Sequence, residues 1–157
     1  MRALVSLAVS LALPLAVGAL AGWVTSSSVQ SWYPTLEKPS FNPPAWIFGP
    51  AWTVLYVLMG IAAWLVWRTG WGRPEVRFAL AVYALQLVLN GIWSLIFFGL
   101  RAPGPAFAEI VLLWLAIAAT LALFWRVRPL ASGLLVPYLA WVSFAVALNF
   151  SIWRLNP

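Results

Sequence analysis

The sequence predicts an all-α integral membrane protein, folded as a bundle of five transmembrane helices. Charged residues make up 8% of the 157 positions and hydrophobic residues 64%, whereas a soluble domain carries about 25% charged residues. Such a chain cannot cover a water-facing surface. Long apolar runs are the second observation, because a helix needs about 20 mostly apolar residues to cross a bilayer. The length allows five such runs with short connections, so we expect one membrane domain over residues 1–157 and no separate soluble domain.

Five apolar runs predict the spans. The first run follows Arg2 and also fits a secretory signal, with small residues at 18–21 for cleavage, but its length and the four later runs favour a span. Gly18 and Gly22 form a G-x-x-x-G pair, which indicates either close helix packing or the ordinary abundance of small residues in membranes. The expected spans are about residues 3–24, 46–67, 78–100, 106–125 and 130–153.

The longest polar segment lies between the first two spans, at about residues 25–45. Its prolines prevent a regular helix over most of its length and restrict the free loop, so we expect the loop to hold a defined shape. These prolines are Pro34, Pro39, Pro43 and Pro44.

The residue types exclude several classes of function. The chain has no cysteine and no histidine, which excludes disulfides, thiolate metal sites, thiol nucleophiles and Ser-His hydrolases. Lys and Arg number nine against three acidic residues. Because the basic residues stand at the ends of apolar runs, they indicate membrane topology and headgroup contacts, and we expect no nucleic-acid partner.

The distribution of these basic residues predicts the orientation in the membrane. With five spans, the N-terminus shares a side with the second and fourth connections. That side carries six basic residues and the other side three, so the N-terminus is expected in the cytoplasm. The six are Arg2, Arg68, Arg73, Arg77, Arg126 and Arg128, and the three are Lys38, Arg101 and Arg154.

Polar side chains inside the spans are the candidates for function. In the third span, Gln86 and Asn90 share a helix face with Trp93 and Phe97. Their amides either orient a flat, partly polar ligand or bond a neighbouring helix, and spacing alone slightly favours the second role. Glu109 in the fourth span could reach headgroups or Arg101, or relay protons. Two aromatic faces complete the set: Phe48, Trp52 and Tyr56 in the second span, and Tyr138, Trp141, Ala145 and Leu148 in the fifth.

Five motifs, in order along the whole chain, resemble the TspO family of translocator proteins, also called peripheral-type benzodiazepine receptors. The most specific runs from Trp32 to Pro44 and reads WYPTLEKPSFNPP. The others are AWTVLY at 51–56, QLVLN at 86–90 followed by Trp93, PYLAW at 137–141, and LNF at 148–150. The chain is therefore identified as a member of this family, of the bacterial kind.

The resemblance implies a membrane protein with a ligand pocket beneath the first loop, usually a homodimer, here in a bacterial cell membrane. It implies no required cofactor. Its ligands would be porphyrins such as protoporphyrin IX or haem, sterol-like molecules, and isoquinoline carboxamides or benzodiazepines. One departure concerns the sterol motif of the last span, where the family pattern has tyrosine and this chain has Phe150.

The resemblance also assigns roles to residues. Trp52 and Asn90 would hydrogen-bond the ligand, and Trp32 and Trp141 are candidates for light-dependent porphyrin breakdown. Trp32, Tyr33 and Pro44 would belong to a lid. The pocket would be lined by Tyr56, Trp93, Phe97, Trp141 and Ala145, with Phe48, Gln86 and Leu148 as further candidates from their helix faces.

Three functions follow in order of preference. The first is a tetrapyrrole-binding sensor or regulator, since this needs a pocket but no catalytic groups. The second is a porphyrin or sterol transporter, although no inverted repeat is visible in the chain. The third is a photo-oxidative enzyme acting through Trp32 or Trp141. Because histidine and cysteine are absent, a bound porphyrin should be held by stacking and polar contacts rather than by axial ligation of iron.

Overall fold

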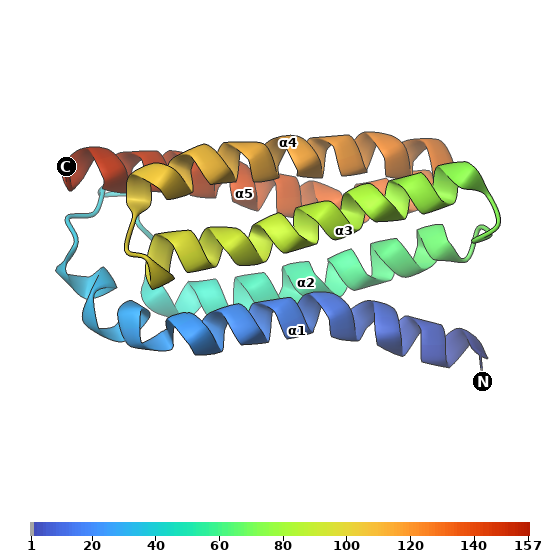
Figure 1. Ribbon diagram of the computed structural model, residues 1–157, viewed down its shortest axis with the longest axis horizontal. Coiled ribbons are helices and arrows are strands. Elements are labelled where there is room, and N and C mark those ends of the chain that lie inside the picture. Colours follow the sequence, from blue (N-terminus) through green and yellow to red (C-terminus); the bar gives the residue numbers. More distant parts are fainter. Residues whose placement is uncertain (1) are drawn as a thin grey trace.

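The computed structural model describes residues 2–157 and shows an antiparallel bundle of five long helices (Figure 1). All five are long and apolar enough to cross a membrane, and residues 2–157 contain no strand. The predicted fold class is therefore confirmed. The elements are α1 (Arg2–Ser31), the 3₁₀ turn η1 (Tyr33–Thr35), α2 (Ala45–Trp67), α3 (Pro74–Ser94), the π-helical turn η2 (Leu95–Gly99), α4 (Pro103–Val127) and α5 (Pro129–Leu155).

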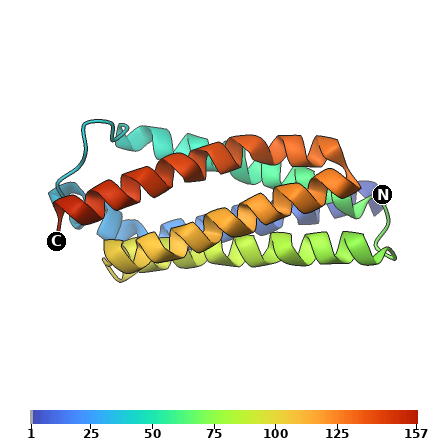
Figure 2. The same ribbon diagram turned by 90° about the horizontal axis from the view of Figure 1, so that it is seen from above.

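The helices form a closed ring in the order α1, α2, α5, α4, α3. α4 packs extensively against both α5 and α3. α1 packs against α2 and makes fewer contacts with α3 than with α2 (Figures 1 and 2). The apolar core lies inside this ring, with Met59, Ile117 and Phe124 fully excluded from solvent. α1 has the smallest buried share of the five helices. α1 therefore exposes most of its side chains outward, while its contact with α2 keeps it in the ring.

Prolines set the starts of three helices. Pro74, Pro103 and Pro129 each occupy the first helical position, where the missing N–H leaves no hydrogen bond unmade. α3, α4 and α5 therefore begin one to four residues earlier than the expected starts at 78, 106 and 130.

The first helix extends further than the sequence predicts. α1 continues through Ser31, so residues 25–31 are helical rather than part of the loop. This segment contains neither proline nor glycine, and its hydroxyls bond back to carbonyls of the preceding turn, as Thr25 Oγ1 does to Ala21 O at 2.7 Å and Ser31 Oγ to Ser27 O at 2.7 Å. The loop over this end of the bundle is therefore limited to residues 32–44.

A π-helical turn ends the third span. In η2 the N–H of Leu100 donates to the carbonyl of Leu95 at 2.8 Å, a five-residue step. The wider turn ends at Gly99, and Arg101, two residues on, has a positive φ of 54°. The turn places Phe97, 2% exposed, against the loop aromatic Trp32 at a ring-centroid distance of 5.9 Å. The turn thus joins α3 to the loop.

Candidate functional site

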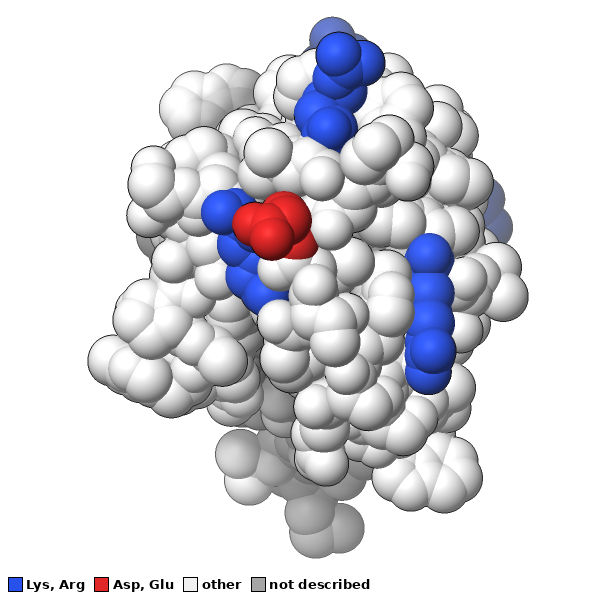
Figure 3. All heavy atoms as spheres, turned by 90° about the vertical axis from the view of Figure 1, so that its left-hand side faces the viewer, with Lys and Arg blue, Asp and Glu red and all other residues white. Residues whose placement is uncertain are grey.

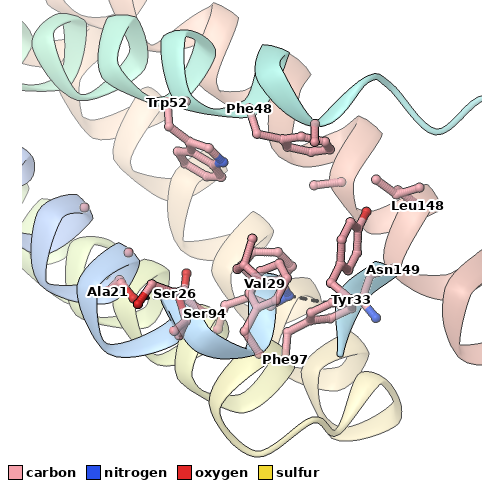
Figure 4. A pocket seen from close by; sticks show the side chains of 18 of the residues that line it. Ala21, Ser26, Val29, Tyr33, Phe48, Trp52, Ser94, Phe97, Leu148 and Asn149 are labelled. Carbon is pink, nitrogen blue, oxygen red and sulfur yellow. Dashed lines mark hydrogen bonds between the residues drawn. The ribbon is translucent and has the colours of Figure 1, made fainter. Parts of the chain in front are cut away.

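A cavity of about 920 Å³ lies beneath the loop at one end of the bundle, between α1, α2, η2 and α5 (Figure 4). α2 contributes Phe48, Trp52 and Tyr56 to its lining, and α5 contributes Trp141, Ala145 and Leu148. Tyr33 comes from the loop, Trp93 from the end of α3 and Phe97 from η2. The structure thus brings together nine of the residues selected from the sequence.

Aromatic pairs form the walls of this cavity. Trp52 stacks on Tyr56 at a centroid distance of 5.5 Å, and Phe48 meets Trp141 edge-on at 6.0 Å. The spacing of four residues along α2 is what aligns the first pair with Phe48 on a single face. The indole of Trp52 projects into the cavity (Figure 4), and no acceptor for its N–H lies in the part of the chain that the structure describes. This N–H is available to a ligand.

Gln86 and Asn90 do not line the cavity. The Tyr56 hydroxyl donates to Asn90 Oδ1 at 2.7 Å, Asn90 Nδ2 donates to the Tyr138 hydroxyl at 3.1 Å, and that hydroxyl donates to Gln86 Oε1 at 2.9 Å. All four side chains are buried. The expected contact between Asn90 and a ligand stays a prediction: Asn90 is outside the cavity lining, and its amide already bonds Tyr56 on α2 and Tyr138 on α5. Of the two roles left open for these amides, the structure shows the interhelical one.

The loop residues divide between the cavity and its cover. Tyr33 lines the cavity, and its hydroxyl donates to Asn42 Oδ1 at 2.9 Å. Burial raises the pKa of the Tyr33 phenol, so this hydroxyl stays protonated. Trp32 packs against Phe97, and Pro44 is the exposed residue before α2, so neither lines the cavity. Their place in a lid stays a prediction, and the carbonyl of Pro44 accepts from the N–H of Ile47 at 3.0 Å, which starts α2.

Several contributors were missed from the sequence. α1 supplies one wall through small and polar residues, among them Gly22, Thr25 and Ser26, which show no aromatic pattern that could have selected them. Gly18 packs so closely on the Tyr56 ring that a side chain there would collide with it, while a side chain on Gly22 would meet open space. Only one glycine of the G-x-x-x-G pair therefore serves close packing.

Two asparagines near the C-terminal end of α5 bond to distant parts of the chain, and one of them, Asn156, holds the loop. Asn156 accepts from the backbone N–H of Glu37 at 3.0 Å and donates to its carbonyl at 2.9 Å. Asn149 accepts from Trp93 Nε1 at 3.0 Å and donates to Pro103 O at 2.8 Å. The first pair ties the loop to the last residues of the chain, across more than one hundred positions of sequence, and no local signal could have revealed it.

The groups that the cavity offers are aromatic and polar rather than metal-ligating. Within residues 2–157 there is no group of three acidic, histidine or cysteine side chains that could hold a metal. Glu109 is buried, and neither of its carboxyl oxygens has a hydrogen-bond partner among the described residues, so of the contacts considered for it the one with Arg101 is not made in this structure. The cavity instead offers flat aromatic surfaces and an indole donor.

Fold and site together define a class: small five-helix membrane proteins with an aromatic cavity closed by a structured loop. The chain belongs to the TspO/MBR family, whose sequence model matches residues 10–154. It is therefore an integral membrane protein, in which the bilayer surrounds the apolar helices.

Individual relatives cover much of the chain. The Tryptophan-rich protein TspO of Chlorobaculum tepidum is 47% identical over 156 residues, 99% of each chain. The Translocator protein of Homo sapiens is 45% identical over 126 residues, which are 80% of this chain and 75% of the human one. The Tryptophan-rich sensory protein of Cereibacter sphaeroides is 44% identical over 126 residues, 80% of this chain and 77% of that protein.

Proposed function

We propose that this protein binds a tetrapyrrole, such as protoporphyrin IX or haem, in the cavity and acts as a sensor or regulator of tetrapyrrole metabolism. The observation that carries the proposal is the cavity itself: about 920 Å³ with stacked aromatic walls, near the upper end of the usual 300–1,000 Å³ range of small-molecule sites. Flat macrocycles stack on such walls. The word "sensory" in the name of one relative agrees with this role.

The position of the cavity favours binding over transport. Its lining comes from residues 15–30 of α1, 33–42 of the loop, 45–56 of α2, 93–98 of α3 and η2, and 141–152 of α5, all toward the loop end. The other half of the ring is filled by core side chains such as Val66, Val76 and Phe124, each 0% exposed. One copy of the chain thus offers a cavity at one end of the bundle rather than a passage across the bilayer.

Filling the cavity, or removing its indole donor, should weaken binding. We expect Ala145→Phe, which puts a ring into the chamber, and Trp52→Phe, which removes the free indole N–H, to weaken protoporphyrin IX binding about tenfold or more, equivalent to about 1.4 kcal/mol. The measurement is quenching of tryptophan fluorescence in the dark, with purified protein in detergent. Leu112→Phe on the outer face of α4, where Leu112 is 58% exposed, is the matched control. Linear, unsaturable quenching that ignores both cavity variants would refute the proposal.

Metal-free and iron porphyrins should bind with similar affinity. The remaining candidates for iron ligation are a tyrosine or Met59, but Met59 is fully buried in the core and the Tyr56 hydroxyl already donates to Asn90. We therefore expect dissociation constants for protoporphyrin IX and haem within about threefold of each other. An affinity for haem far above that of the metal-free form, with a shifted Soret band, would show that axial ligation occurs.

We also propose that the chain lies in a bacterial cell membrane with its N-terminus in the cytoplasm, which places the cavity toward the outer side. The asymmetry of basic residues supports this orientation. Because the chain lacks cysteine, single cysteines report position cleanly. In whole cells, Ser40→Cys in the loop should react with a membrane-impermeant maleimide, and Gly72→Cys in the α2–α3 connection should react only after lysis. The reverse pattern would invert the topology.

The other partners inferred from the resemblance stay predictions. Sterol-like and isoquinoline carboxamide ligands are expected to occupy the same cavity, and the chain is expected to form a homodimer in the membrane. Of the two tryptophans considered for light-dependent porphyrin breakdown, Trp141 lines the cavity and Trp32 does not, which favours Trp141 as the candidate.

A further inference from the structure

One charged side chain lines the cavity. Lys38, in the loop, is half-buried, and its ammonium lies 5.0 Å from the centre of the Tyr33 ring. Its Nζ donates to the carbonyl of Leu36 at 2.8 Å and to that of Pro34 at 3.3 Å. The loop thus holds a positive charge at the mouth of an otherwise uncharged chamber.

This charge has no anionic partner in the described part of the chain. The one ion pair found there joins Arg73 to Glu75 at the opposite end of the bundle. The neighbouring Glu37 is exposed, does not line the cavity and is tied through its backbone to Asn156. Figure 3, which views this end, shows basic side chains standing apart on a largely uncharged face, with acidic atoms beside one of them.

The geometry of the ammonium leaves one donor unused. A lysine ammonium has three N–H groups and no acceptor, and two of these groups are directed to the carbonyls of Pro34 and Leu36. The carbonyls and the Tyr33 ring hold Nζ in place before any ligand arrives. A charge-assisted hydrogen bond from a fixed ammonium is stronger than a neutral one, more so beside apolar walls than in water.

We infer that Lys38 binds a carboxylate of the ligand, and that the cavity therefore selects apolar molecules carrying an acid group directed toward the loop. The Trp52 N–H supplies a second, neutral donor from α2. The flat apolar part of the ligand would then lie between the Lys38 ammonium and the Trp52 N–H. The inference deepens the proposed function and rests on it, because the propionates of a tetrapyrrole are such acid groups. An anionic lipid headgroup offers similar chemistry, but it lacks the flat body that the aromatic walls fit.

The test compares protoporphyrin IX with its dimethyl ester, which has the same macrocycle without the charge. Both are titrated in the dark against wild type, Lys38→Met and Lys38→Arg in nanodiscs of zwitterionic lipid. We expect wild type to bind the acid about tenfold more tightly than the ester, as one charge-assisted hydrogen bond allows. Lys38→Met should lose that preference through weaker binding of the acid alone, and Lys38→Arg should keep most of it. Arg154→Met, which changes a basic residue outside the cavity lining, should behave as wild type.

Three outcomes would overturn the inference. If both porphyrins bind saturably and Lys38→Met changes neither, the proposed function stands and the role of Lys38 fails. If neither porphyrin binds saturably, the proposed function itself fails. If nanodiscs of anionic lipid weaken binding of the acid by wild type but not by Lys38→Met, the ammonium takes a lipid phosphate, and the assignment to a ligand carboxylate is wrong.

Discussion

Replacing Tyr138 by phenylalanine is expected to lower the free energy of unfolding by about 1–3 kcal/mol. The Tyr138 hydroxyl accepts from Asn90 and donates to Gln86, so it joins α5 to α3 at two points. Removing it leaves Asn90 Nδ2 and Gln86 Oε1 buried without these partners. A buried polar group that loses its partner costs more than the bond itself contributed, and lipid offers no water to replace it.

Tyr83→Phe is the matched control for this prediction. Tyr83 lies on α3, is 6% exposed, and its hydroxyl has no hydrogen-bond partner among the described residues. Removing that hydroxyl should leave stability unchanged or raise it slightly. The measurement is unfolding in increasing mole fractions of dodecyl sulfate, followed by circular dichroism. Equal destabilisation by both variants would show that ring packing, rather than the hydrogen-bond network, accounts for the effect.

Gly60→Ala is expected to cost about 1–3 kcal/mol, the usual penalty of overpacking. A methyl group at Gly60 would lie 2.7 Å from the carbonyl oxygen of Ser10 and 2.9 Å from the Cα of Leu11. Both are backbone atoms of α1, so no side-chain rotation relieves the contact. α1 would have to move away from α2, against which it makes its most extensive packing.

The control for this second prediction is Gly133→Ala on α5, where an added methyl meets nothing within 4 Å. Alanine also favours a helix over glycine, so Gly133→Ala should be neutral or mildly stabilising. Thermal unfolding of the purified proteins in detergent compares the two. An unchanged melting temperature for Gly60→Ala would mean that α1 shifts at no cost and that its contact with α2 contributes little to stability.

The sequence was sufficient for features that depend on local periodicity. Five spans follow from hydropathy, and the aromatic face of α2 follows from a spacing of four residues, because helix geometry alone places Phe48, Trp52 and Tyr56 together. All three line the cavity. Helix ends were less accurate, since a proline that starts a helix and a serine-rich segment that continues one both resemble loop in composition.

Features that depend on distant partners could not be obtained this way. An amide on one helix face can bond either a ligand or a neighbouring helix. That Asn90 bonds a neighbouring helix is seen only in the fold, where Tyr138, 48 residues away in sequence, accepts from its amide. The π-helical turn that directs Phe97 to the loop has no local sequence signal. The hydrogen bond between Asn156 and Glu37 likewise forms only when the first loop packs against the C-terminal end of α5.

The small residues of α1 have a consequence for the breadth of ligand recognition. This helix forms one wall of the cavity through residues such as Gly22, where an added side chain would meet open space. Such a wall leaves room for ligands of different size, whereas the opposite side presents the large side chains Trp141 and Leu148 of α5. We therefore expect the cavity to bind ligands of quite different size, provided that each has a flat surface that stacks on the aromatic rings.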